Sequence, residues 1–170
     1  MNSESERNWK NWQPSDPKIL VREATSADAV LLLSIYRSTR EQELNLTPWD
    51  EKQKSTFIQS QFDAQQFHYK KYYLNSAYWI IEYNKTPAGR LYVDVSDHVR
   101  IIDIALLPQF RNLGLGSKVL KDVQEMAKTL NLPVSIHVEQ YNPAKQLYKR
   151  LGFIEREVVN SIYILMEYNH

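Results

Sequence analysis

A strand, a loop with two glycines, a long amphipathic helix and a second strand follow one another within residues 99–139. The helical part places its apolar residues every three to four positions on one face: Val119, Leu120, Val123, Met126, Ala127 and Leu130. Two strands joined through a helix of this length need a crossover connection. We therefore expect them to lie parallel in one sheet, with the helix packed across it.

The other predicted strands are separated by short links rich in turn residues, which indicates antiparallel pairing. The predicted strands span residues 19–22, 78–83, 90–95, 99–107, 134–139, 153–158 and 162–168. Helices are expected after the capping pair Thr25 and Asp28, after Asp50, after Pro108 and after Asn142. The first of these helical patterns is expected to break over residues 41–49. The sequence thus predicts an α/β fold of the mixed α+β kind, with a mostly antiparallel sheet of about seven strands, one central parallel pair and about four helices.

A chain of 170 residues with 43% apolar side chains is long enough for one well-filled core. We expect a single domain over residues 19–170, preceded by a polar arm at residues 1–18 that is extended or partly disordered. Trp9 and Trp12 are the exceptions in this arm, and their indoles could dock on the domain or on a second subunit. No apolar run exceeds five residues, so we expect a cytoplasmic protein with neither a membrane span nor a signal peptide.

Composition excludes several kinds of chemistry. The chain has no cysteine, which rules out disulfides, thiolate metal sites and a cysteine nucleophile. Its four histidines have no metal-ligand spacing, so no metal is expected. A formal net charge of +1 provides no overall field for a polyanion, and a nucleic-acid partner is therefore disfavoured.

The loop before the long helix has the features of an anion-binding site. Gly114 and Gly116 would let the backbone approach a ligand closely, and the first N–H groups of the helix carry the positive end of its dipole. A dinucleotide-binding fingerprint would need glycine where Val119 stands, and a P-loop would need four residues between its glycines. The alternative interpretation is that both glycines serve only a tight turn from strand to helix.

Two motifs occur in the second half of the chain: Leu106-x-Pro108-x-x-Arg111-x-x-Gly114-x-Gly116, and Asn142-x-Ala144-x-x-Leu147-Tyr148-x-x-x-Gly152-Phe153. In order and separation they resemble the GNAT superfamily of acyl-CoA-dependent N-acetyltransferases, over about residues 99–153. The resemblance implies an enzyme that moves an acetyl group from acetyl-CoA to a primary amine by direct attack in a ternary complex. It also implies a sheet whose two parallel strands splay apart.

The resemblance implies a set of cofactor-binding residues. The pyrophosphate of acetyl-CoA would lie on the backbone N–H groups of Arg111, Asn112, Leu113, Gly114, Leu115, Gly116 and Ser117. The pantetheine arm would pair with the first parallel strand near Leu106, with Asn142 bonding it from the far side. The family usually has glycine where Asn112 stands, but asparagine tolerates left-handed backbone better than other residues with a Cβ. We therefore expect the loop conformation to be kept.

Tyr148 falls where the family has its general-acid tyrosine, beside the thioester sulfur. Its place on an apolar helix stripe is also typical of a core tyrosine, so the residues alone leave both interpretations open. A general base is not identified. The candidates are Asp103, which could instead pair with Arg90 or Arg100, and His137, Glu139, Glu82 or a water chain.

In the family, acceptor specificity comes from about residues 41–50 and 158–163. Acidic side chains there suit a cationic acceptor or are simply solvated: Glu41, Glu43, Asp50 and Glu51. An aromatic group could line the acceptor pocket or belong to the core and its rim: Tyr69, Tyr72, Tyr73, Tyr78 and Trp79. The acceptor, a small-molecule or peptide amine, stays open, as does a possible homodimer. The alternative function is an acyl-CoA-binding sensor or assembly module without turnover.

Overall fold

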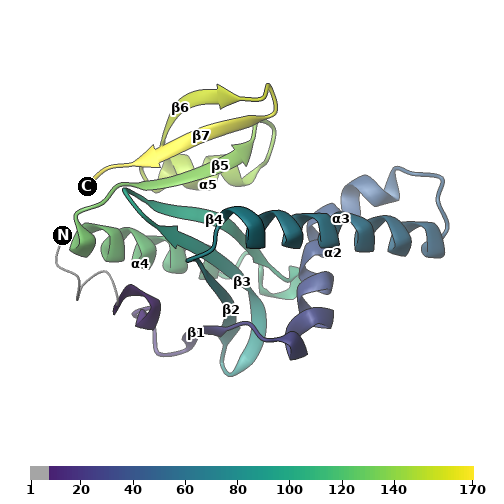
Figure 1. Cartoon of the computed structure of the whole chain (residues 1–170), viewed down its shortest axis with the longest axis horizontal. Helices are drawn as coiled ribbons and strands as arrows, with labels where there is room; N and C mark the ends of the chain where they lie inside the picture. The colour runs from purple at the N-terminus through teal and green to yellow at the C-terminus, as the bar shows by residue number, and fades with distance from the viewer. Residues whose placement is uncertain (1–7) are drawn as a thin grey trace.

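A computed structural model describes residues 8–170, and over this range seven strands form one sheet in the order β1-β2-β3-β4-β5-β7-β6 (Figure 1). The strands are β1 (Ile19–Glu23), β2 (Ala77–Tyr83), β3 (Thr86–Val95), β4 (Val99–Leu106), β5 (Val134–Glu139), β6 (Ile154–Val159) and β7 (Tyr163–Tyr168). Only β4 and β5 pair in parallel; the other neighbouring strands are antiparallel. The mixed sheet expected from the sequence is therefore confirmed.

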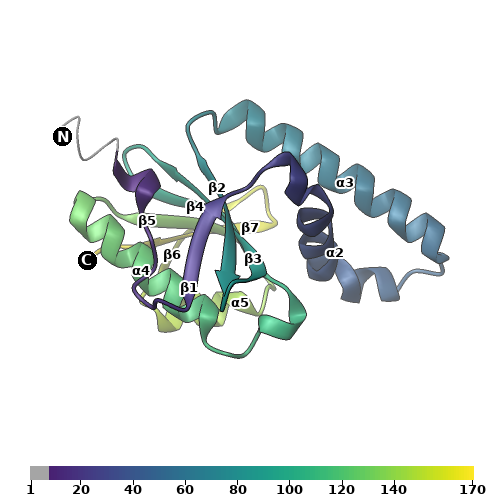
Figure 2. The ribbon, with the colours of Figure 1, turned by 90° about the horizontal axis from the view of Figure 1, so that it is seen from below.

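Within residues 8–170 four α-helices flank this sheet: α2 (Ala29–Asn45), α3 (Glu51–Tyr72), α4 (Leu115–Leu130) and α5 (Ala144–Arg150). The two helices α2 and α3 lie on one side of the sheet and α4 on the other (Figure 2). Short 3₁₀ turns are η1 (Trp9–Asn11), η2 (Ser26–Asp28) and η3 (Pro108–Phe110). None of the helices in the described range has the length and apolarity needed to cross a bilayer.

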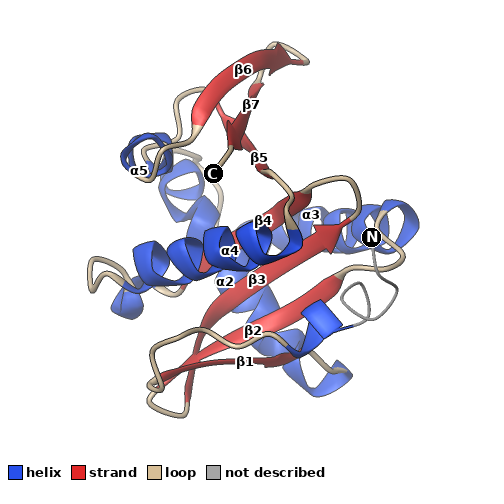
Figure 3. Ribbon diagram, turned by 90° about the vertical axis from the view of Figure 1, so that its left-hand side faces the viewer, coloured by secondary structure: helices blue, strands red, loops and turns tan. Residues whose placement is uncertain are grey.

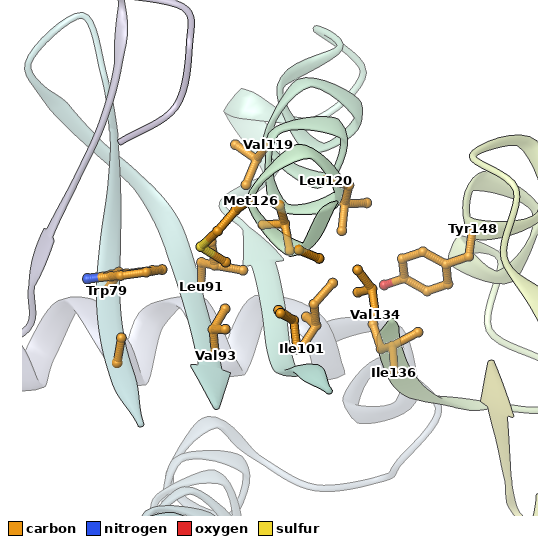
Figure 4. Close-up of a cluster of buried hydrophobic side chains, with 14 of the residues drawn as sticks. Trp79, Leu91, Val93, Ile101, Val119, Leu120, Met126, Val134, Ile136 and Tyr148 are labelled. Carbon is orange, nitrogen blue, oxygen red and sulfur yellow. The ribbon is translucent and has the colours of Figure 1, made fainter. Parts of the chain in front are cut away.

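Each face of the sheet carries its own apolar core. Under α4 the strands and the helix bury a cluster that includes Trp79, Leu91, Val93, Ile101, Val119, Leu120, Met126, Val134 and Ile136 (Figure 4). Under α2 and α3 a second cluster contains Leu32, Ile35, Tyr36, Leu44, Ile58, Phe62, Ile80 and Tyr92. Since successive side chains of a strand point to opposite faces, neighbouring residues of β3 and β4 belong to different cores.

The end of α2 differs from the sequence prediction. The helix was expected to break over residues 41–49, but it continues to Asn45, and only residues 46–50 connect it to α3. Leu44 is 2% exposed and packs in the same cluster as Ile58 of α3. The prediction was wrong because the last turns of α2 are polar except for Leu44, and one apolar residue gives no helical period in the sequence. Glu41 and Glu43 consequently lie on a helix and not in an acidic loop.

Part of the predicted polar arm is docked on the domain. Trp9 is 6% exposed, and its ring centroid lies 5.9 Å from that of Trp79, while the Trp12 and Trp79 centroids are 5.4 Å apart. The side-chain amide of Gln13 pairs with the backbone of Val21 like a short extra strand: Nε2 donates to the carbonyl at 2.8 Å and Oε1 accepts from the N–H at 2.9 Å. Residues 1–7 of the arm lie outside the described residues.

Candidate active site

The parallel strands β4 and β5 pair over only three positions and then diverge. Their register is Val99 with Val134, Arg100 with Ser135, and Ile101 with Ile136. Beyond this point β4 stays paired with β3 and β5 stays paired with β7, so the two halves of the sheet separate (Figure 3). The backbone groups of both strands that face the gap are left without a ladder partner, which suits an extended ligand that pairs like a strand.

A cavity of about 670 Å³ opens at this gap, and we call it the larger cavity. Its lining comes from the end of β4, the loop before α4, the start of α5 and one side of α2. The lining residues are Ser38, Thr39, Glu41, Gln42, Ile104, Ala105, Leu106, Pro108, Arg111, Gly116, Leu120, Asn142, Pro143, Ala144, Leu147 and Tyr148. Of the nine sequence-predicted cofactor residues, Leu106, Arg111, Gly116 and Asn142 line it directly.

The loop between Leu106 and α4 is shaped by two residues with left-handed backbone. Asn112 has φ of 59° and Gly114 has φ of 79°, so Asn112 adopts the conformation predicted for it. A Cβ on Gly116 would meet, within 4 Å, only Leu106 Cδ1 at 3.9 Å. A side chain at this position would therefore extend into the cavity without a clash. The space next to Gly116 is therefore open to the larger cavity.

Backbone donors are available at the start of α4, but not at every position of the predicted set. The N–H of Arg111 already donates to the Pro108 carbonyl at 3.2 Å. The first hydrogen bond of α4 runs from the N–H of Lys118 to the carbonyl of Gly114, at 3.1 Å. The N–H groups of Gly116 and Ser117 precede that bond and lie at the positive end of the helix dipole.

Asn142 precedes α5, and the oxygen of its side-chain amide is already hydrogen-bonded within the chain. Its Oδ1 accepts a hydrogen bond from the N–H of Ala144 at 2.9 Å, so Nδ2 is the part of the amide that remains to donate, and the residue lines both cavities. Seven-residue α5 then carries Tyr148, whose ring is 6% exposed and points toward β4 and β5 (Figure 4). Burial, and next the nearby Asp103 carboxylate, raise the pKa of the Tyr148 hydroxyl, so it keeps its proton at neutral pH.

A second cavity of about 270 Å³, the smaller cavity, lies toward the α2 and α3 face of the sheet. Its polar and aromatic lining comprises Tyr36, Thr39, Arg40, Glu43, Gln65, Tyr69, Arg90, Asp103, His137, Glu139, Asn142, Tyr148 and Tyr163. Four residues line both cavities: Thr39, Ile104, Asn142 and Tyr148. The two cavities therefore meet at the gap between β4 and β5, with the Tyr148 ring at the junction.

A buried ion pair forms one wall of the smaller cavity. Arg90 is 1% exposed and pairs with Asp103, for which Arg90 was one of the two predicted partners. The guanidinium also donates to Gln65 Oε1 at 3.1 Å, and the rings of Tyr36 and Tyr92 flank it at 5.9 and 5.2 Å from their centroids. Because a buried charge is costly unless it is paired, these contacts hold both ions in place.

The other candidate bases lie in different surroundings. Nδ1 of His137 lies 2.7 Å from Nη1 of Arg100, and burial, followed by the Arg100 cation, lowers the pKa of the imidazole. Glu139 faces the smaller cavity. Glu82 lines neither cavity and lies 3.7 Å from Nε of Arg22.

Only part of the predicted acceptor region reaches the cavities. Tyr69 is the one member of the aromatic group that lines the smaller cavity; the single hydroxyl hydrogen of Tyr78 is instead shared between the carbonyls of Tyr69 and Tyr73, at 3.1 and 3.0 Å. Glu41 and Glu43 line the larger and the smaller cavity, respectively, whereas Asp50 caps α3 and Glu51 pairs with Arg37. Sequence reasoning missed Ser38 and Thr39, because polar residues on a helix look like an ordinary solvated face.

A parallel pair that diverges beside a glycine-containing loop, with a tyrosine where two cavities meet, is the arrangement that the sequence resemblance implies for an acyltransferase. Residues 36–153 match the model of the Acetyltransferase (GNAT) family. The match spans more than half of the chain, and the chain therefore belongs to this family.

Individual relatives are distant. An N-alpha-acetyltransferase of Sulfurisphaera tokodaii is 33% identical over 66 residues, which are 37% of this chain and 40% of that protein. The match thus spans less than half of that relative's length. PaiA N-acetyltransferase of Thermoplasma acidophilum, solved in complex with coenzyme A, has a TM-score of 0.66 at 16% identity, with 89% of this chain and 99% of that chain covered.

Another solved structure has a bound analogue of both substrates. It is Naa50 of Arabidopsis thaliana in complex with the bisubstrate analogue CoA-Ac-MVNAL, with a TM-score of 0.58, 15% identity, and coverage of 90% of this chain and 99% of that chain. At these identities the likeness shows the GNAT fold.

Proposed function

We propose that the protein is an N-acetyltransferase that binds acetyl-CoA in the larger cavity and a primary amine in the smaller one. The observation that carries this proposal is the junction of the two cavities, where Thr39, Ile104, Asn142 and Tyr148 line both. A thioester carbonyl and an amine entering from the two cavities would meet between β4 and β5. Holding two reactants next to each other in this way accounts for much of the rate acceleration of a transfer reaction over the same reaction in solution.

The residues present suit coenzyme A. In this proposal the pyrophosphate binds the N–H groups of residues 112–117, and Arg111 contributes its side chain but not its N–H, which Pro108 already accepts. The pantetheine arm lies along the end of β4 near Leu106, and the Nδ2 group of Asn142 donates to it from the other side. Bound acetyl-CoA supplies the activated acetyl group, and no metal is part of the proposal.

Tyr148 is proposed as the general acid for the departing sulfur. Its hydroxyl keeps its proton because burial raises its pKa. In water that phenol is a weaker acid than a thiol, so Tyr148 first stabilises the sulfur as a hydrogen-bond donor. Those apolar surroundings disfavour a tyrosinate as well as a thiolate, so the sulfur takes the Tyr148 proton only as the hydroxyl regains one from the attacking nitrogen. A backbone N–H at the diverging end of β4 is proposed to bind the developing oxyanion.

The acceptor is proposed to be a peptide or small-molecule amine. The relative from Sulfurisphaera tokodaii is an N-alpha-acetyltransferase, and the Arabidopsis structure holds an analogue that joins coenzyme A to the peptide MVNAL. Both point to primary amines, and a peptide amino terminus is the first acceptor to test. Pairing of two copies of the chain stays a prediction.

Two measurements test the function. Isothermal calorimetry should detect binding of coenzyme A to the purified chain, and a thiol-release assay should detect turnover over a panel of peptides, polyamines and small amines. Absence of coenzyme A binding would rule out the proposal. Binding without acetylation of any amine would instead support an acyl-CoA-binding module, the alternative that the sequence leaves open.

A further inference from the structure

We propose that Glu139, at the end of β5, binds the acceptor as an ammonium ion and takes the proton that its nitrogen must lose before attack. This inference rests on the proposed N-acetyltransferase function and names a catalytic residue for it. A lysine-like amine has a pKa of about 10.4 and an α-amino group one of about 8, so either is mostly protonated at neutral pH. A nearby acceptor for that proton is therefore required.

Glu139 lines the smaller cavity from the end of β5. Its neighbour Val138 is buried in the α4 core, and alternation along β5 directs Glu139 to the opposite face, where it lines the smaller cavity. The carbonyl of Glu139 accepts a hydrogen bond from the N–H of Asn142 at 3.0 Å. Asn142 and Tyr148, which line both cavities, share the smaller one with Glu139.

The other charged side chains that line the smaller cavity form ion pairs with one another, and Glu139 does not take part in them. Arg40 pairs with Glu43 at 3.1 Å on α2, and Arg90 pairs with Asp103 between β3 and β4. Over residues 8–170 Glu139 makes no ion pair. Among the charged side chains that line the smaller cavity these two pairs cancel, and Glu139 remains as one negative charge. An ammonium ion is the ligand that this charge attracts.

His137, on the same face of β5, cannot take this role in the observed arrangement. Arg100 can only donate hydrogen bonds, so Nδ1 of His137 must accept from it. A neutral imidazole then carries its hydrogen on Nε2, which leaves neither ring nitrogen free to accept a proton. Arg100 is itself held in place by a second bond, from its Nε to Nε2 of His98 at 3.2 Å.

The other carboxylates that the sequence offered as bases, Asp103 and Glu82, lie beside arginines. Asp103 is held by the buried Arg90, and withdrawing its charge would leave that guanidinium unpaired. Glu82 lies outside both cavities, beside Arg22. Apart from Tyr148, the proposed acid, the remaining titratable groups that face the smaller cavity are tyrosines, Tyr36 and Tyr69 from the helices and Tyr163 from β7. A tyrosine hydroxyl has a pKa of about 10 and is protonated at neutral pH, so it cannot act as the base.

The protons of the reaction balance with Glu139 in this role. The ammonium gives one proton to Glu139, the neutral nitrogen bonds to the thioester carbonyl carbon, and the carbon–sulfur bond breaks. Tyr148 protonates the sulfur and is reprotonated by the second proton that the nitrogen loses as the amide forms. Glu139 releases its proton to solvent. The products are the acetylated amine, the free thiol of coenzyme A and one proton.

The test compares Glu139→Gln with Glu157→Gln, the same chemical change on β6, outside both cavities. We expect Glu139→Gln to lower kcat/KM for the amine roughly 10²-fold at pH 7, with the dissociation constant of coenzyme A within twofold of the wild type. The deficit should shrink as the pH approaches the pKa of the amine, because a neutral amine needs no base. Glu157→Gln should stay within threefold of the wild type.

Two more variants and one ligand-binding result distinguish a failure of the role proposed for Glu139 from a failure of the proposed function. Glu139→Asp keeps the carboxylate and should recover most of the lost activity, whereas His137→Gln should cost far less than Glu139→Gln. The inference is overturned if Glu139→Gln matches the wild type, if its deficit is the same at every pH, or if His137→Gln is the more damaging change. A wild-type chain that binds coenzyme A but acetylates no amine would overturn the proposed function itself, and this inference with it.

Discussion

The guanidinium of Arg111 donates from Nη2 to the hydroxyl of Ser38 at 3.0 Å and from Nε to the carbonyl of Leu106 at 2.9 Å. One side chain thus ties α2 and the end of β4 to the loop before α4. The two partners Ser38 and Arg111 are 73 residues apart in the sequence. The loop that we propose for the pyrophosphate is therefore held from outside as well as by its own turns.

Ser38→Ala should weaken coenzyme A binding with little effect on folding. One hydrogen bond to a charged group is lost at a partly exposed site, and a cost of about 1 kcal/mol corresponds to roughly fivefold in affinity. Isothermal calorimetry measures this change. Ser34→Ala is the matched control, because the Ser34 hydroxyl only donates to the Val30 carbonyl one turn earlier. Equal affinities in the two variants would show that the contact with Arg111 does not support the loop.

Tyr148→Phe should lower turnover roughly 10²-fold and leave coenzyme A affinity nearly intact. The change removes the hydroxyl and keeps the buried ring, so packing at the junction is preserved. Because burial raises the pKa of Tyr148, the wild-type rate should not fall through ionisation of this group below pH 10. Thiol release under saturating acetyl-CoA measures the effect, with Tyr141→Phe as a control on a side chain that is 93% exposed. Unchanged turnover would remove Tyr148 from the mechanism.

Gly116→Ala should weaken coenzyme A binding without lowering the stability of the fold. The added Cβ meets nothing closer than 3.9 Å, and alanine favours a helix over glycine by about 1 kcal/mol, so the melting temperature should hold or rise. The methyl group nevertheless fills the space that we propose for the pyrophosphate, and coenzyme A affinity should fall at least about tenfold.

Gly89→Ala is the contrasting substitution. Its Cβ would clash with the Ala105 carbonyl oxygen at the pairing of β3 with β4, so this variant should lose stability. Thermal unfolding and calorimetry on both variants check the pair of predictions. If Gly116→Ala binds coenzyme A as the wild type does, the glycine serves only the turn into α4.

The parts of the fold that the sequence predicts are those with strong local signals. Period and turn chemistry locate α4 and its flanking strands, and Asn131 closes that helix in the left-handed conformation typical of its residue type. The pairing of Asp103 was predicted as a choice of two arginines, because an acid in an apolar strand needs a cation. The sequence could not choose between Arg90 and Arg100, since the choice depends on which face of the neighbouring strand each occupies.

The parts that the sequence leaves open depend on contacts between distant segments. The end of α2 is fixed by Leu44 against α3, and a single apolar residue among polar ones gives no periodic signal. Ser38 acquires its position in the site only when α2 packs beside the loop that carries Arg111. The gap between β4 and β5 was expected from the family resemblance alone, because residues 102–106 read as a continuous strand with or without a partner.

Trp9→Ala should destabilise the domain, because the docked arm is part of the core. The Trp9 ring is buried against Trp79 of β2, and truncation of a buried aromatic residue costs about 3 kcal/mol. Urea unfolding followed by circular dichroism measures the change. Trp49→Ala is the control, because this residue, between α2 and α3, is 36% exposed and contacts Phe57 at the surface, so its loss should cost less than about 1 kcal/mol. Equal unfolding midpoints for Trp9→Ala and the wild type would mean that the arm adds nothing to the stability of the domain.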